Sequence, residues 1–224
     1  MIKLIENYIK SLNGSFVPNI DFINAQKKLD GLSGALTAQI ISKCLSFLND
    51  DLAYLEVGIY QASNLVMVAS TNRSKLCVGV DNFSQEFEEN KKYSCSTEEL
   101  VQKRFKDYDL KNCFYIKKDF RTFLQNENNI NGKKIGLYFF DGPHELQDQI
   151  DGIEMSFNLL ADEAIIFIDD LASDNVIKAY DHLKLNKHLQ FISNLTSDYH
   201  IKEIFNQGQM ILKYTRYPME NIKS

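Results

Sequence analysis

The fold is decided by one stretch of the chain, YFFDGPHELQDQIDGIEMSFNLLADEAIIFIDDL, which spans residues 138–171. It contains the second half of one short apolar run, IGLYFF (135–140), and all of another, EAIIFI (163–168), and an aspartate directly follows each run. Two buried strands joined by a helix are typical of a parallel sheet. The apolar residues between the runs recur at steps of three and four, which predicts one amphipathic helix: Leu146, Ile150, Ile153, Phe157 and Leu160.

Three further apolar runs come earlier in the chain and have the same character. They are AYLEV (53–57), KLCVGV (75–80) and CFYIKK (113–118), and longer helical patterns separate them. Near the end, LQFISNL (189–195) and QMILKY (209–214) flank a polar stretch without a helical period, which favours an antiparallel pair. The sequence therefore predicts an α/β fold with a mostly parallel seven-stranded sheet, an antiparallel C-terminal strand and helices on both faces.

The region before the first run has a different composition. Residues 1–12 and 38–49 have helical patterns, and Thr37 fits the N-cap position of the second helix. The stretch between the two helices, residues 13–36, has a composition typical of a loop, because it contains Gly14, Pro18, Gly31 and Gly34.

The chain has 224 residues, which is enough to bury a substantial core without disulfides. We expect one domain over residues 1–224, in which a helical and loop extension (1–36) precedes the core (37–214). The four cysteines have neither CxxC nor metal-ligand spacing, so we expect them to be reduced, as in a cytoplasmic protein: Cys44, Cys77, Cys95 and Cys113.

Charge and hydropathy narrow the choice of partners. The net charge is -5, and no cluster of Lys and Arg is interleaved with aromatic residues, which argues against a nucleic-acid partner. The N-terminal segment MIKLIENYIKSL carries Lys3, Glu6 and Lys10, which is untypical of a signal peptide or a membrane span. We expect a cytoplasmic protein that acts on a small molecule or glycan and not on a membrane. A homodimer is the default expectation for its oligomeric state.

Acidic residues stand at the end of each of the first five runs. Parallel strands joined by right-handed crossovers have their carboxyl ends at one edge of the sheet, and ligands of open α/β folds bind at that edge. Carboxylates also cap helices that follow strands, which is the alternative interpretation of this pattern. The acids, in order, are Glu56, Asp81, Asp119, Asp141 and the pair Asp169 and Asp170.

The turn after the first run gives a second indication of a ligand. It contains Gly58, which allows a tight turn and the close approach of a ligand, but it lacks the GxGxxG spacing of a dinucleotide fold. Asp81, one strand over, has the position of a carboxylate that accepts hydrogen bonds from a ribose diol. Tyr60, inside the turn, has two interpretations, because its ring can contact a cofactor or simply pack.

These features resemble the class I S-adenosylmethionine-dependent methyltransferases, and among them the metal-dependent O-methyltransferases that act on sugars of macrolides and related compounds. The resemblance covers roughly residues 37–214 and is most specific in LEVGIYQASN, VGVDNF and the stretch quoted first. It implies that Glu56 and Gly58 line the methionine part of the cofactor, Asp81 holds the ribose and Asp119 lies near the adenine. It also implies that the metal ligands are those after the fourth and fifth strands: Asp141, Asp169 and Asp170.

The chemistry of such a reaction explains why a metal is expected. A sugar hydroxyl is a very weak acid, and a divalent cation lowers the pKa of an oxygen that it coordinates. Three carboxylates without a Cys or His cluster suit Mg²⁺ better than Zn²⁺. Asp169 and Asp170 can share one ion only if the chain leaves the strand between them, and the alternative is that one of them caps the next helix.

Two further features stay open on the sequence alone. His144, three residues after Asp141, has the position of a general base that takes the hydroxyl proton, or of a histidine that bonds the backbone at a helix start. Residues 84–99 form either a substrate lid or an ordinary surface loop. This stretch ends in a predicted capping box formed by Ser96 and Glu99.

Other functions compete with methyl transfer. The first alternative is an oxidative enzyme, because some proteins of this fold with an acidic metal site resemble antibiotic hydroxylases. A binding module without catalysis is a second alternative, suggested by Ala62, where the family usually has a second glycine, and by Pro143, where it often has an acid. A nicotinamide dehydrogenase is disfavoured, because its glycine pattern is missing.

Overall fold

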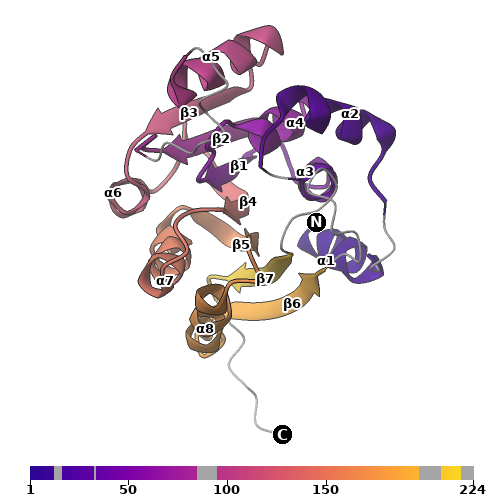
Figure 1. Cartoon of the computed structure of the whole chain (residues 1–224). Coiled ribbons are helices and arrows are strands. Elements are labelled where there is room, and N and C mark those ends of the chain that lie inside the picture. The colour runs from indigo at the N-terminus through magenta and orange to yellow at the C-terminus, as the bar shows by residue number, and fades with distance from the viewer. Residues whose placement is uncertain (13–16, 33, 85–94, 197–207, 218–224) are drawn as a thin grey trace, which may run out of the picture.

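A computed structural model of the chain describes residues 1–12, 17–32, 34–84, 95–196 and 208–217 (Figure 1). Within these ranges, seven strands form one sheet in the order β3-β2-β1-β4-β5-β7-β6. The first five strands are parallel, and β7 runs antiparallel to both of its neighbours, β5 and β6, which confirms the predicted fold class. The strands are β1 (Leu52–Val57), β2 (Leu76–Asp81), β3 (Cys113–Lys117), β4 (Lys134–Phe140), β5 (Leu160–Ile168), β6 (Leu189–Leu195) and β7 (Gln209–Thr215).

Helices cover both faces of this sheet (Figure 1). One face carries α1 (Ile2–Ser11), α2 (Ile20–Leu29), α3 (Ala35–Ser46), α4 (Ser63–Thr71) and α5 (Thr97–Asp107). The other face carries α6 (Phe120–Asn126), α7 (Leu146–Glu154) and α8 (Asp174–Leu183). Among the described residues, no helix is both long enough and apolar enough to cross a membrane.

Strand β4 shows why the central runs are apolar throughout. Leu137 and Phe139 are buried in the core beneath α1, α3 and α4, whereas Tyr138 and Phe140 are buried in the core beneath α6, α7 and α8. Successive side chains of a strand point to opposite faces, so a strand covered on both sides needs apolar residues at every position. The Tyr138 hydroxyl is satisfied inside this core, since it donates to the Gly152 carbonyl at 2.8 Å.

The N-terminal region differs from the sequence prediction in two respects. The stretch predicted as a loop contains α2, which Asn19 caps by accepting from the Asp21 amide at 2.9 Å. The second helix begins at Ala35 with Gly34 as its N-cap, so the assignment of Thr37 as the cap was wrong. Thr37 is buried inside the first turn of α3, where its hydroxyl accepts a hydrogen bond from another side chain.

The predicted extension also contributes to the main core. Ile2, Ile5 and Ile9 of α1 and Leu29 of α2 are buried together with side chains of α3 and α4. An amphipathic helix gains most of its stability from burial of its apolar face. The first helices are therefore packed as part of the layer that covers this face of the sheet.

The helix between β4 and β5 is shorter than its apolar stripe predicted. α7 ends at Glu154, a 3-10 turn follows over Met155–Asn158, and β5 already begins at Leu160. Leu160 belongs to the strand and not to the helix, because it pairs with Ile135 of β4. His144 lies two residues before the first residue of α7.

The loop before α5 is described only in part. The capping box is confirmed, with the Ser96 hydroxyl accepting from the Glu99 amide and the Glu99 carboxylate accepting from the Ser96 amide. Most of the predicted lid, residues 85–94, lies outside the described residues.

One helix position tests how tightly the second core is packed. Replacing a helical Gly with Ala usually stabilises a protein by about 1 kcal/mol. At Gly152 in α7, however, a Cβ would meet the Phe140 ring at 2.2 Å. We expect Gly152→Ala to lower the free energy of unfolding by about 1 to 3 kcal/mol, because overpacking outweighs helix propensity. Denaturant unfolding measures this change, and a stabilised variant would contradict it.

Candidate active site

The acidic residues predicted from the sequence lie at the carboxyl edge of the parallel strands. Glu56 is the next-to-last residue of β1, Asp81 ends β2, and Asp141 and Asp169 directly follow β4 and β5. Two backbone contacts join the segments after β1 and β4. The Asp141 amide donates to the Val57 carbonyl at 2.9 Å, and a Cβ on Gly58 would lie 1.9 Å from the Asp141 carbonyl oxygen. Gly58 also has φ +84°, so only glycine fits this position without strain.

The turn between β1 and α4 is held against β2 through Asp81. One carboxylate oxygen accepts from the Tyr60 amide at 2.8 Å, and the other accepts from the Phe83 amide at 2.7 Å. Burial raises the pKa of Asp81, although these backbone amides oppose the rise. The backbone amides thus fix the carboxylate in place at the edge of the sheet.

Glu56 belongs to a buried polar network that reaches into the core. Its Oε2 atom accepts from the Tyr54 hydroxyl at 2.7 Å and from the Asn64 amide at 2.7 Å. Burial raises the pKa of Glu56 to about 7, because the two hydrogen bonds only partly compensate for lost solvation. Asn64 Oδ1 is buried and has no hydrogen-bond partner within the described ranges, an unusual state for a polar atom.

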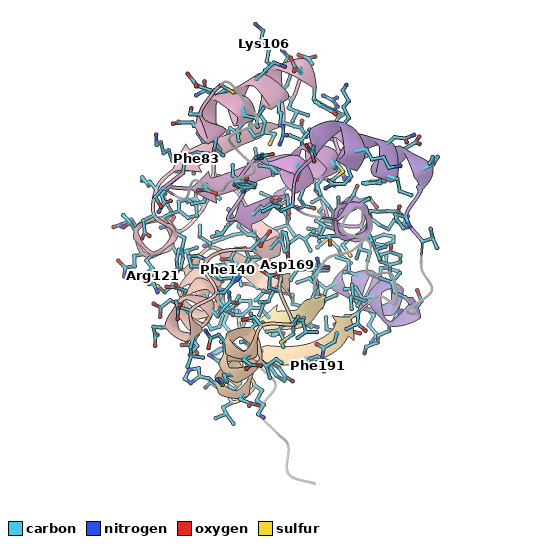
Figure 2. The ribbon with its side chains drawn as sticks, in the orientation of Figure 1. Phe83, Lys106, Arg121, Phe140, Asp169 and Phe191 are labelled. Atoms are coloured by element: carbon cyan, nitrogen blue, oxygen red, sulfur yellow. The ribbon has the colours of Figure 1, made fainter. Side chains whose placement is uncertain are left out.

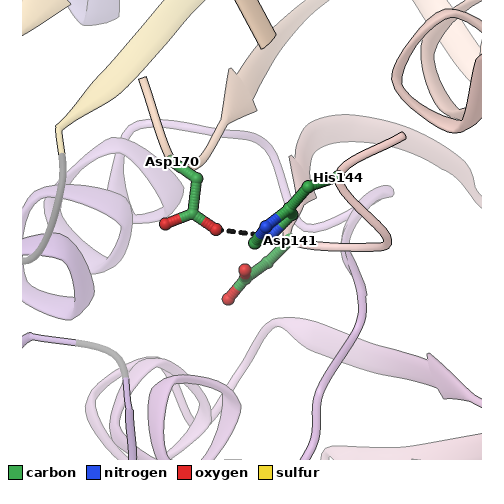
Figure 3. Close-up of side chains that lie close together, drawn as sticks. All are labelled: Asp141, His144 and Asp170. Atoms are coloured by element: carbon green, nitrogen blue, oxygen red, sulfur yellow. Dashed lines mark ion pairs between the residues drawn. The ribbon is translucent and has the colours of Figure 1, made fainter. Parts of the chain in front are cut away.

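Three side chains converge after β4 and β5, as Figure 3 shows: Asp141, His144 and Asp170. Each offers one ligand atom, and these atoms lie within 4.8 Å of one another. His144 Nε2 is 2.5 Å from Asp170 Oδ2, and this hydrogen bond raises the pKa of His144. Asp170 has φ 56°, so the chain has left the extended conformation of β5 at this residue.

Asp169 has a different partner from Asp170 although the two are adjacent. Its Oδ1 atom accepts from the side-chain amide of Gln209 at 3.2 Å, and the same amide donates to the Thr37 hydroxyl at 2.6 Å. Figure 2 shows Asp169 towards the middle of the molecule, whereas Lys106 and Phe191 lie at its periphery. Gln209 is fully buried and stands at the start of β7.

The carboxylates at this edge raise one another's pKa. Burial is the largest cause for Asp141, whose pKa is well above its usual range, and the charges of Asp169 and Asp170 add to it. Burial and the Asp170 charge raise the pKa of Asp169 to about 7, against the hydrogen bond from Gln209. An edge of this kind favours protons, cations or hydrogen-bond donors over anions.

Comparisons with known proteins agree with this architecture. No protein-family model and no curated protein matches the sequence. Solved structures match in fold: the O-methyltransferase TomG from Streptomyces achromogenes, in complex with SAM, has a TM-score of 0.62 at 13% identity over 96% of each chain. This chain has the methyltransferase fold.

Two further methyltransferase structures give the same result. A putative caffeoyl-CoA O-methyltransferase from Staphylococcus aureus has a TM-score of 0.63 at 14% identity, covering 94% of this chain and 99% of that one. An O-methyltransferase from Bacillus cereus, in complex with SAH, has a TM-score of 0.60 at 10% identity, covering 96% and 100%.

Within the methyltransferase fold, the predicted residues fall into two groups. Glu56, Gly58, Tyr60 and Asp81 lie together around the turn after β1. Asp119 stands apart as the N-cap of α6, with its Oδ1 accepting from the Thr122 amide at 3.1 Å. The capping interpretation therefore describes Asp119 in this structure.

The second group contains two of the three predicted metal ligands together with His144, the predicted general base. Asp141 and Asp170 lie together with His144, while Asp169 is bonded to Gln209. The sequence had one local signal for the network around Glu56, because residues two apart on a strand share a face, as Tyr54 and Glu56 do. For Gln209 it had none, since 172 residues separate it from Thr37.

The raised pKa values predict how stability depends on pH. The folded protein keeps the Asp169 and Glu56 protons up to about pH 7, whereas an unfolded chain releases them near pH 4. Stability should therefore fall as pH rises from about 4 to 7, on the order of 1 to 3 kcal/mol. We expect Asp169→Asn, which keeps the acceptor for Gln209, to flatten this fall in urea unfolding with EDTA present.

The exposed carboxylate Asp51, just before β1, offers the control. Asp51→Asn should leave the wild-type pH profile unchanged. If Asp169→Asn has the same slope as Asp51→Asn, the Asp169 carboxylate is not held protonated by the fold.

Proposed function

We propose that this protein transfers a methyl group from S-adenosylmethionine to a hydroxyl oxygen of a small molecule or glycan. The observation that carries the proposal is the meeting of Glu56, Gly58 and Asp81 around one turn at the carboxyl edge of a methyltransferase fold. Ligands of open α/β folds bind at this edge. The turn lacks the glycine spacing of a dinucleotide site, so S-adenosylmethionine is favoured over a nicotinamide cofactor.

The residues around the turn fit this cofactor. The Asp81 carboxylate is half-buried and fixed by backbone amides, as a ribose diol requires of its acceptor. Glu56 and the Asn64 oxygen, which has no partner among the described residues, offer acceptors near the start of α4. When bound, the cofactor supplies an electrophilic methyl group on a positively charged sulfur, and the carboxylates of this edge attract that charge. Tyr60 would flank the cofactor, and Asp119 would lie nearer to its adenine.

A divalent cation fits the second group of residues. Asp141 and Asp170 offer hard oxygen ligands, and the cation would lower the pKa of the acceptor hydroxyl and fix its position. The third protein ligand is either Asp169, after release from Gln209, or His144. Three carboxylates favour Mg²⁺, whereas an imidazole nitrogen among the ligands favours a transition-metal ion over Mg²⁺.

His144 cannot ligate the cation and accept the acceptor proton with the same nitrogen. Its Nε2 atom lies against Asp170, which orients the ring and stabilises its protonated form. We propose that His144 is the general base and that Asp141, Asp169 and Asp170 hold the metal. A base of raised pKa works best once the medium is alkaline enough to deprotonate it.

Cofactor binding gives the first test of this function. We expect S-adenosylhomocysteine to bind in calorimetric titration while NAD does not. Asp81→Asn should weaken the affinity by on the order of 10- to 100-fold, because a hydrogen bond to a charged group contributes about 1.5 to 3 kcal/mol. Asp174→Asn, at the exposed start of α8, is the control and should bind like the wild type. Methyl transfer is then tested with labelled S-adenosylmethionine and a panel of sugar and phenolic hydroxyls. Binding of NAD without binding of S-adenosylhomocysteine would refute the proposed function.

Metal binding needs no acceptor and separates the two ligand sets. We expect Mn²⁺ or Mg²⁺, added with S-adenosylhomocysteine, to raise the thermal unfolding midpoint, because repelling carboxylates gain a counter-charge. Asp141→Asn and Asp169→Asn should abolish the shift, while His144→Gln should keep it. Loss in His144→Gln with retention in Asp169→Asn would make His144 the ligand. No shift in the wild type would remove the metal from the proposal.

A further inference from the structure

The turn that carries the proposed cofactor site holds an unfavourable backbone conformation. Tyr60 has φ 47° and Ala62 has φ 57°, both in the left-handed region. Residues with a Cβ are strained there, and such strain persists only where the surrounding structure holds it. Ala62 is fully buried as the N-cap of α4, so the strain lies directly between β1 and the helix.

Arg104 of α5 supplies a restraint on this turn from outside the site. Its side chain is buried, with an exposed fraction of 6%. One terminal nitrogen donates to the Gln61 backbone carbonyl, which lies between the two strained residues. The other donates to the carbonyl of Leu29, the last residue of α2, and contacts the Gln61 side-chain oxygen at 3.3 Å. The planar guanidinium can bridge two acceptors in a fixed geometry, which a lysine ammonium cannot do.

The chain after α2 rests against the same turn. A Cβ on Gly31 would lie 1.9 Å from the Ser63 hydroxyl, so this segment contacts the first residue of α4 closely. The buried Gln26 side chain fixes the segment by donating to the Gly31 carbonyl at 2.9 Å. The end of α2, the turn and the start of α4 are thus joined, with Arg104 as the bridge.

We propose that Arg104 is a positioning residue that holds the turn at Tyr60 to Ala62 in its cofactor-binding conformation. The proposal rests on the proposed function, because it takes this turn as the cofactor site. Arg104 acts through the Gln61 backbone and need not touch the cofactor. Without it, the turn occupies the competent conformation for a smaller fraction of the time, and the apparent affinity falls by that fraction.

The backbone strain at Ala62 can be relieved by mutation, so the effect of Arg104 on cofactor binding can be compared with and without that strain. We expect Arg104→Met to weaken S-adenosylhomocysteine binding by on the order of tenfold in calorimetric titration. Adding Ala62→Gly should restore most of the affinity, because glycine adopts the left-handed conformation without strain. The comparison is a double-mutant cycle: Arg104→Met should weaken binding less in the Ala62→Gly background than in the wild-type background.

Controls separate positioning from general stability. Arg73→Met removes an exposed guanidinium that bonds the Tyr108 and Asp109 carbonyls, and it should keep full affinity. Hydrogen exchange should rise at residues 59–63 in Arg104→Met and not in Arg73→Met. Arg104→Lys keeps the charge but lacks the planar fork that spans the two carbonyls, and it gives the same comparison if Arg104→Met does not fold.

The outcomes distinguish this inference from the proposed function. Wild-type protein that does not bind S-adenosylhomocysteine would overturn the proposed function and this inference with it. Wild-type binding with unchanged affinity in both Arg104 variants would overturn the inference alone. Weakened binding that Ala62→Gly does not improve would also overturn it, because the loss would then come from the fold as a whole.

Discussion

The site depends on the contact between the segments that follow β1 and β4. Gly58 and the Asp141 carbonyl approach so closely that no other residue fits, and the Asp141 amide is bonded to Val57. This contact fixes the distance between the turn that we assign to the cofactor and the cluster that we assign to the acceptor. Methyl transfer requires such a fixed distance, because the reacting atoms must be aligned before the reaction begins.

The carboxylates at this edge work against folding. Glu56, Asp141 and Asp169 all have raised pKa values, which means that the fold disfavours their charged forms. Helix capping does not account for this arrangement, since a capping residue such as Asp119 needs neither burial nor acidic neighbours. Perturbed groups gathered at a ligand edge are typical of functional sites. The same residues that reduce stability are therefore those to which we assign binding and catalysis.

The central strands were predictable because their apolar runs are buried on two faces, and parallel pairing then placed the carboxylates at one edge. Local signals failed where distant contacts decide the structure. In the sequence, Thr37 has the residue type and position of a helix N-cap. In the fold, its hydroxyl instead accepts a hydrogen bond from the Gln209 side chain. α2 did carry a local signal, the Asn19 cap, which the nearby glycines obscured. The strain at Ala62 follows from backbone angles that no residue pattern reveals.

The direction of β7 has a consequence for how the molecule is made. A parallel strand in this position would have its last residue at the carboxyl edge, whereas the antiparallel strand has its first residue there, which is Gln209. A ribosome produces the chain from its N-terminus, so every other residue of the site emerges earlier. The Asp169 carboxylate therefore gains its hydrogen bond from Gln209 only after β7 has been synthesised and has paired between β5 and β6. Closure of the site thus depends on a segment that follows all its other residues along the chain.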